Sequence, residues 1–123
     1  MSIVNHTLNE FGKTIGLDDL SFPETGTVSL QIEQMGTLFF EQASDEVLVY
    51  LTRPLPPFSD TALQTALNLC HYEQGHQVVV QAGLRGDDLL AFLARIPAHE
   101  FTMPAIDRSI SLLEKLHDTV TAQ

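Results

Sequence analysis

Residues 27–52 read TVSLQIEQMGTLFFEQASDEVLVYLT and carry the clearest structural pattern in the chain. In the first part, Val28, Leu30 and Ile32 alternate with polar residues, which is typical of a strand with one face in a core and the other in water. Gly36 and a short polar run then separate two further segments rich in aliphatic and aromatic residues. We therefore predict an antiparallel meander. Its strands are expected at residues 27–33, 37–42 and 47–52.

The segments on either side of the meander have helical spacing. Apolar residues recur at steps of three and four in residues 2–15, and Gly16 is expected to end that helix. A second helix is expected over residues 60–74, with Ser59 as its N-cap and an unusually broad apolar stripe. A third follows around Pro104, which suits the first turn of a helix because its missing N–H needs no partner there.

Two more strands are expected between the last two helices. Residues 76–83 and 89–96 have strand composition, and residues 84–88 contain a glycine suited to a hairpin connection. The proline-rich residues 54–57 are expected to interrupt the sheet, because proline has no N–H to donate in a central strand. The predicted order is αβββαββα, a single α+β domain over residues 1–123 with a five-stranded antiparallel sheet and three helices.

Composition and charge exclude several classes of partner. Hydrophobic residues make up 44% of the 123 residues, which is enough apolar material for a core. The 16 acidic and 6 basic residues give a net charge of −10, and so negative a surface repels phosphate backbones and anionic membranes. No apolar run approaches the roughly 20 residues that span a bilayer. We expect no nucleic-acid partner and no membrane insertion.

Residues suited to catalysis or metal binding do not form a known arrangement. The 5 histidines never occur at chelating spacing. Cys70 lies in the apolar stripe of the second predicted helix, where a thiol is usually inert packing. No nucleophile elbow, Walker A loop or dinucleotide glycine motif is present. We expect no catalytic residue, no cofactor and no metal, and the single cysteine and absent signal peptide indicate the cytoplasm.

The chain has more apolar surface than its own helices should need. Leu38 and Phe40 point to one face of the second predicted strand and Phe39 to the other, and the third strand is also apolar on both faces. A chain of this size buries only about two-thirds of its unfolded surface, so we expect contact with another protein. The alternative is a monomer whose helices cover the whole sheet. The expected dimer-interface residues, from the second helix and the strand after it, are Leu63, Leu67, Cys70, Val78 and Val80.

Short sequence motifs in a fixed order connect the chain to a known family. They are Gly36-Thr37-Leu38 with Glu41-Gln42, Tyr50-Leu51-Thr52-Arg53-Pro54-Leu55, Ala82-Gly83 with Gly86, and Phe101-Thr102-Met103-Pro104 with Leu112-Leu113 and Leu116. Together with the predicted element order, small size, acidic charge and single cysteine, they make the chain resemble the class I type III secretion chaperones, the Tir-chaperone (CesT/SycE-like) family. The resemblance is closest to the SycN branch of that family and covers nearly the whole chain.

This resemblance implies a dimeric chaperone that works without ATP. It would bind the N-terminal segment of a secreted effector or gatekeeper protein and keep that client soluble and secretion-competent. The resemblance to SycN-like members implies that the chain forms a homodimer or a heterodimer with a second small chaperone. It also implies a location in the cytoplasm, with peripheral association at the inner-membrane secretion apparatus. The client could also add to a sheet edge by strand augmentation. The expected client-binding residues are Leu8, Leu38, Phe39, Phe40 and Tyr50.

Two other functions stay open from the sequence. A dimeric α+β domain with an antiparallel sheet is also suited to sensing a small molecule between subunits, and an enzyme is the third alternative. A chaperone should copurify with an unrelated polypeptide, whereas a sensor should melt at a higher temperature when its ligand is bound.

Overall fold

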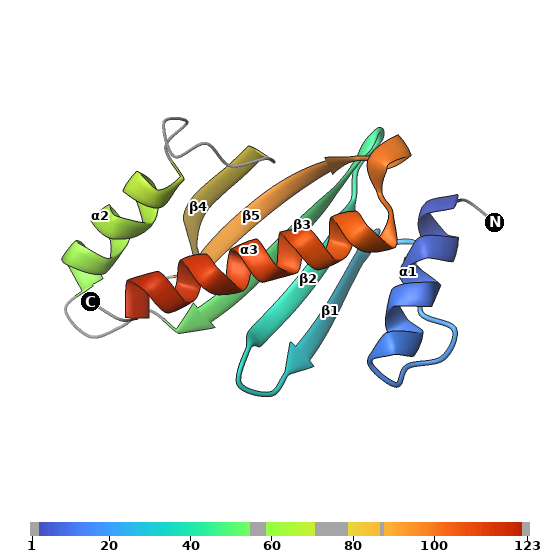
Figure 1. Cartoon of the computed structure of the whole chain (residues 1–123), viewed down its shortest axis with the longest axis horizontal. Helices are drawn as coiled ribbons and strands as arrows, with labels where there is room; N and C mark the ends of the chain where they lie inside the picture. Colours follow the sequence, from blue (N-terminus) through green and yellow to red (C-terminus); the bar gives the residue numbers. More distant parts are fainter. Residues whose placement is uncertain (1–2, 55–58, 71–78, 87, 122–123) are drawn as a thin grey trace.

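The structure is a computed structural model that describes residues 3–54, 59–70, 79–86 and 88–121. Its elements follow the predicted αβββαββα order, and the α+β class is confirmed (Figure 1). The elements are α1 (Ile3–Thr14), β1 (Thr27–Ile32), β2 (Gly36–Gln42), β3 (Glu46–Pro54), α2 (Ser59–Leu69), β4 (Val79–Arg85), β5 (Leu89–Pro97), the short 3₁₀ helix η2 (Ala98–Glu100) and α3 (Met103–Thr121).

The strands form one antiparallel sheet in the order β1-β2-β3-β5-β4. The predicted meander accounts for the first three strands, each of which pairs with the next. The hairpin of β4 and β5 then returns so that β5, the second of the two, lies against β3. β1 and β4 are therefore the two edges of the sheet.

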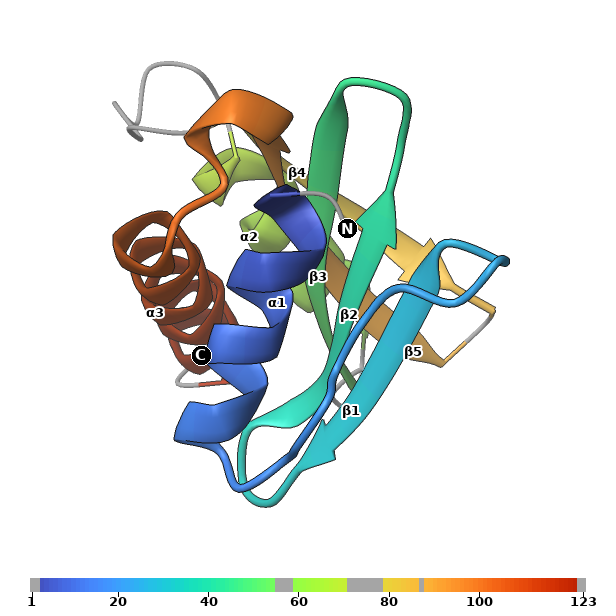
Figure 2. The same ribbon diagram turned by 90° about the vertical axis from the view of Figure 1, so that its right-hand side faces the viewer.

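The helices gather on one side of the sheet. Figure 2 shows α1 and α3 on the same face, and α2 lies near the β4 edge, where it contacts both α3 and β4. No described helix lies on the opposite face, which we call the outer face. None of the described helices is long and apolar enough to cross a membrane.

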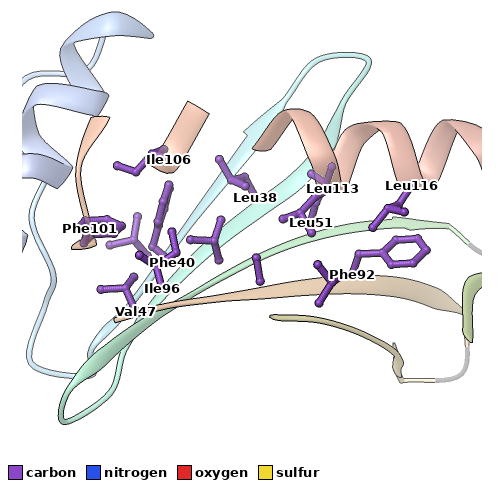
Figure 3. Packing of buried hydrophobic residues seen from close by; sticks show 14 of the residues in the cluster. Leu38, Phe40, Val47, Leu51, Phe92, Ile96, Phe101, Ile106, Leu113 and Leu116 are labelled. Atoms are coloured by element: carbon purple, nitrogen blue, oxygen red, sulfur yellow. The ribbon is translucent and has the colours of Figure 1, made fainter. Parts of the chain in front are cut away.

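The core lies between the inner face of the sheet and the helices that cover it (Figure 3). Strand alternation puts Phe40 of β2 and Leu51 of β3 on this face, and both are fully buried. The Phe40 ring meets Phe11 of α1 at 5.3 Å and Phe101 at 6.2 Å between centroids, both edge-on. Such aromatic pairs add to the free energy gained by burial.

His117 joins α3 to the middle of the sheet. Its Nε2 lies 2.7 Å from the backbone oxygen of Leu51, and because a carbonyl oxygen only accepts, Nε2 is the protonated nitrogen that donates. The imidazole also meets the Phe92 ring edge-on at 4.7 Å. Burial lowers the pKa of His117 below its ordinary value of 6.5, so the ring is neutral at pH 7.

Several boundaries differ from the prediction. β3 continues past the expected end and includes Pro54, which occupies the last position of the strand, where its missing N–H matters least. α2 ends at Leu69, short of the predicted Gln74; residues 71–78 lie outside the described part of the chain. The predicted C-cap is confirmed, because Gly16 has a φ of 85°, which favours glycine.

Candidate functional site

The outer face presents one residue from each strand in a continuous row. Residues opposite one another in an antiparallel pair point to the same face, so the register places these side chains next to each other across the whole sheet. We call them the outer row. In spatial order they are Ser29, Phe39, Tyr50, Leu93 and Gln81.

Phe39 and Tyr50 form the aromatic centre of the outer row. Their rings are stacked, with centroids 4.8 Å apart and planes 9° from parallel. Phe39 is only 9% exposed, although no described helix covers its face of the sheet. Other side chains of the outer face must therefore shield this ring.

Arg85, the last residue of β4, provides part of that shield. Its guanidinium carbon lies 4.2 Å above the centroid of the Phe39 ring and 5.9 Å from that of Tyr50. One terminal nitrogen of Arg85 also donates to the Tyr50 hydroxyl over 3.4 Å. The cation, the phenol and the phenyl ring thus form one cluster, which we call the arginine–aromatic cluster.

A hollow of about 410 Å³ lies next to this cluster on the outer face. Its floor is low because Gly83 and Ala91, two small residues, lie opposite each other in the pairing of β4 with β5. A Cβ atom added to Gly83 would meet no atom within 4 Å, so the space above it is open. The hollow is lined by Glu41, Leu48, Tyr50, Gln81, Ala82, Gly83, Ala91 and Leu93.

Arg95 is a second charged residue on the outer face, and it links residues of three strands. Arg95 donates to Glu46 over 2.6 Å and to Gln81 over 3.2 Å. Its charge is therefore already paired within the sheet.

Three of the expected client-binding residues lie in the core instead. Leu38 and Phe40 share the inner face of β2, and Leu8 lies on the side of α1 that packs into the core; all three are 0% exposed. In this conformation no other chain can reach their side chains, so that part of the expectation is corrected. Phe39 and Tyr50, which have the opposite strand parity, lie on the outer face.

The residues expected at a dimer interface divide in a similar way. Leu67 of α2 is 49% exposed, and Cys70 is partly buried, which raises the pKa of its thiol to about 11. Val80 instead belongs to the core, because its register partner Ala94 faces inward. Val78 and the side chain of Leu63 lie outside the described part of the structure.

Two functional candidates were missed by sequence reasoning. Leu84, with 48% exposure, and Arg85 were assigned to a hairpin turn, whereas both belong to β4. Their alternation with Ala82 and Gly83 continues the strand pattern and could have extended the predicted strand by two residues.

A larger hollow beside the β1–β2 turn offers less chemistry. Arg53, which lines it, donates to the backbone oxygen of Met35 and pairs with Asp118 over 2.8 Å, so its charge is used to hold the turn to α3. In the residues that the structure describes, no three His, Cys, Asp or Glu side chains gather as a metal site would require. The outer face is therefore the candidate functional surface.

Comparison with known proteins gives a consistent answer. A sequence model of the family described as type III secretory system chaperone SycN matches residues 3–121. Chaperone protein SycN from Yersinia enterocolitica is 24% identical over 123 residues, which cover 99% of each chain. Among solved structures, a chain of the ExsC–ExsE complex superposes with a TM-score of 0.69 at 21% identity, covering 98% of this chain and 92% of that one. A chain of the HopA1–SchA chaperone–effector complex gives a TM-score of 0.67 at 22% identity, covering 96% of both.

Proposed function

The chain belongs to the type III secretory system chaperone SycN family, and we propose that it binds the N-terminal segment of a secreted client, with the outer face of its sheet as the contact surface. The client is an effector or, as for the SycN branch, a secretion gatekeeper protein. Binding keeps the client partly extended, soluble and ready for export, and needs no ATP. We place this activity in the cytoplasm, with peripheral association at the inner-membrane secretion apparatus.

The observation that carries this proposal is an outer row that no described helix covers. Phe39, Tyr50 and Leu93 form an apolar strip on a sheet face that no described helix covers. The strip is only partly buried at Tyr50 and Leu93, and Arg85 shields it at Phe39. An apolar sheet face without a helix over it is suited to binding another chain. The fold neighbours support it, because the HopA1–SchA structure is a chaperone bound to its effector.

Strand addition is the second means of contact in this proposal. β1 is the edge strand far from α2, and its outward backbone groups have no partner strand in the described chain. An extended client segment can add to such an edge through main-chain hydrogen bonds, while its side chains reach the outer face.

Dimer formation through α2 and β4 completes the proposal. Leu67 on α2 and Leu84 on β4 are large, exposed apolar residues near the same edge of the sheet. Cys70, three residues after Leu67, is partly buried against the core and lies at the margin of this surface. The second chain is another copy of this protein or a second small chaperone.

Coexpression with the secreted substrates encoded by the same secretion system tests the proposal. We expect native mass spectrometry to detect a complex of two small chaperone chains with one client, stable without nucleotide. Phe39→Ser with Tyr50→Ser should abolish client capture while the circular dichroism spectrum stays unchanged. Ile3→Ser, a substitution at an exposed residue of α1, is the matched control and should retain the client. A monomer that captures no client would contradict the proposal.

A further inference from the structure

We propose that Arg85 makes the outer face selective for a client segment in which an apolar side chain and a carboxylate point to the same side, two residues or one helical turn apart. This inference deepens the proposed function and rests on it. The apolar side chain enters the hollow beside the arginine–aromatic cluster, and the carboxylate binds the Arg85 guanidinium.

Arg85 is oriented so that its donors can reach a client. Its guanidinium is stacked over Phe39, with 4.2 Å between the guanidinium carbon and the ring centroid. Stacking uses the flat face of the guanidinium and leaves most of its N–H groups directed outward from the edges. Among the described residues, the bond to the Tyr50 hydroxyl, 3.4 Å long, uses one of these donors. The cluster therefore holds a guanidinium whose remaining donors match a carboxylate in bidentate geometry.

The spacing between Arg85 and the hollow suits a single client segment. Gly83 and Arg85 are two residues apart on β4 and so point to the same face, with Cα atoms roughly 7 Å apart in an extended strand. Alternate residues of an extended client have the same spacing, and residues one helical turn apart have nearly the same. One client segment can therefore fill the hollow above Gly83 and reach Arg85 at the same time.

The distribution of charge also favours a carboxylate at Arg85. The protein carries −10 overall, which repels acidic segments from most of its surface. On the outer face Arg95 is neutralised by Glu46, whereas the described contacts of Arg85 are two aromatic rings and a hydroxyl. Arg85 is thus a local attractive point for a carboxylate on an otherwise repulsive surface, and this fixes the register of the client.

Two short synthetic peptides test this inference. They share a central leucine and differ only in having glutamate or glutamine two positions after it. We expect the wild-type protein to bind the glutamate peptide about tenfold more tightly, as a charge-assisted hydrogen bond predicts. Arg85→Gln should abolish that preference. Arg108→Gln removes an exposed arginine on α3 and is the matched control, which should keep the preference.

The hollow is tested by a second variant. Gly83→Val places a β-branched side chain where the space is open and the strand accepts it, so the protein should stay folded and lose affinity for both peptides.

The following results would overturn the inference. In the peptide experiment, they are equal affinity of the wild type for the two peptides, no binding of either peptide, or a preference for glutamate that survives in Arg85→Gln. In the second experiment, it is a change of oligomeric state in Gly83→Val, which would assign the hollow to a second copy of the chain. If Arg85→Gln still captures the coexpressed client at wild-type affinity, the inference fails and the proposed function stands. If the wild type captures no client, the proposed function itself fails.

Discussion

Phe39 and Phe40 are consecutive residues of the same type, and strand parity sends their side chains to opposite faces of the sheet. Phe40 is fully buried between β2 and the helices, where its ring contacts two others. Phe39 lies on the outer face against Tyr50 and beneath Arg85. Two phenylalanines that are adjacent in the sequence therefore have different roles, because one belongs to the core and the other to the outer face.

Alanine substitution should expose this difference. Phe40→Ala should lower the free energy of unfolding by about 3–5 kcal/mol, the usual range for a buried phenylalanine that leaves a cavity. Phe39→Ala should cost about 1–2 kcal/mol, because the outer face can relax toward solvent. Urea denaturation followed by circular dichroism measures both. Equal losses would contradict the assignment of Phe39 to a contact surface.

The buried His117 should make stability depend on pH. Burial lowers its folded-state pKa below the ordinary 6.5, so the unfolded chain binds more protons in the interval between the two values. The stability that the neutral ring provides is therefore complete above pH 6.5 and decreases as the pH falls toward the folded-state pKa. We expect the melting temperature to fall between pH of about 7.5 and about 5.5.

The control for this prediction is His117→Gln, which keeps an N–H donor for the Leu51 carbonyl and cannot titrate. The variant should lose part of the pH dependence. If its melting temperature falls as steeply as that of the wild type, other groups are responsible.

Gly36 allows the β1–β2 hairpin to pack closely against the neighbouring strand β3. Its φ of 128° lies in the region that favours glycine, and a Cβ atom there would collide with the backbone oxygen of Thr52 in β3. The hairpin can approach β3 this closely only because the residue has no side chain.

Alanine at this position should therefore disturb both the turn and the neighbouring strand. Gly36→Ala should destabilise the protein by more than about 2 kcal/mol, since backbone strain and a steric collision combine. Gly83→Ala is the matched control, because its Cβ atom would meet nothing within 4 Å, and it should be neutral or slightly stabilising. Thermal melts of the two variants decide the matter; similar melting temperatures would contradict the prediction.

Much of the element pattern was readable from the sequence, because alternation and helical spacing are local signals. The strand with Val28, Leu30 and Ile32 was placed correctly for that reason. The face of β3 that would be covered was not readable, since Val47 to Leu51 is apolar on both faces and only the packing of α3 distinguishes them. Leu8, Leu38 and Phe40 were assigned to the client surface for lack of that long-range information.

The arginine–aromatic cluster could not be predicted for a related reason. Phe39 and Arg85 are far apart in the chain and lie on strands that are not neighbours, so they meet only in the assembled sheet. Strand order is a property of the assembled sheet, and no local pattern near Arg85 reports it.

In the whole molecule, the described helices cover one face of the sheet and leave the other face without a helix. The helices shield the inner face, while the outer face, the β1 edge and the exposed leucines near α2 stay open. The high negative charge keeps such a protein soluble until these surfaces meet their partners.

The proposed dimer predicts a clear change in mass. Leu67→Glu with Leu84→Glu should convert the dimer to a monomer, because charged side chains in an apolar interface would be desolvated without a partner. Light scattering after size exclusion measures the mass, and circular dichroism checks that the fold is retained. Ile3→Glu, at an even more exposed apolar residue on α1, should stay dimeric. A double variant that remains dimeric would place the interface elsewhere.

The position of α3 has a consequence for biosynthesis. This helix supplies Ile106, Leu113 and Leu116 to the core, yet it follows all five strands in the chain. During translation the strands leave the ribosome before α3 exists, so the nascent chain passes through an interval in which the part of the inner face that α3 covers is exposed to water. A protein that we expect to act as a chaperone is therefore itself prone to aggregation during its own synthesis. We expect a fragment that ends before Met103 to aggregate, because it lacks α3.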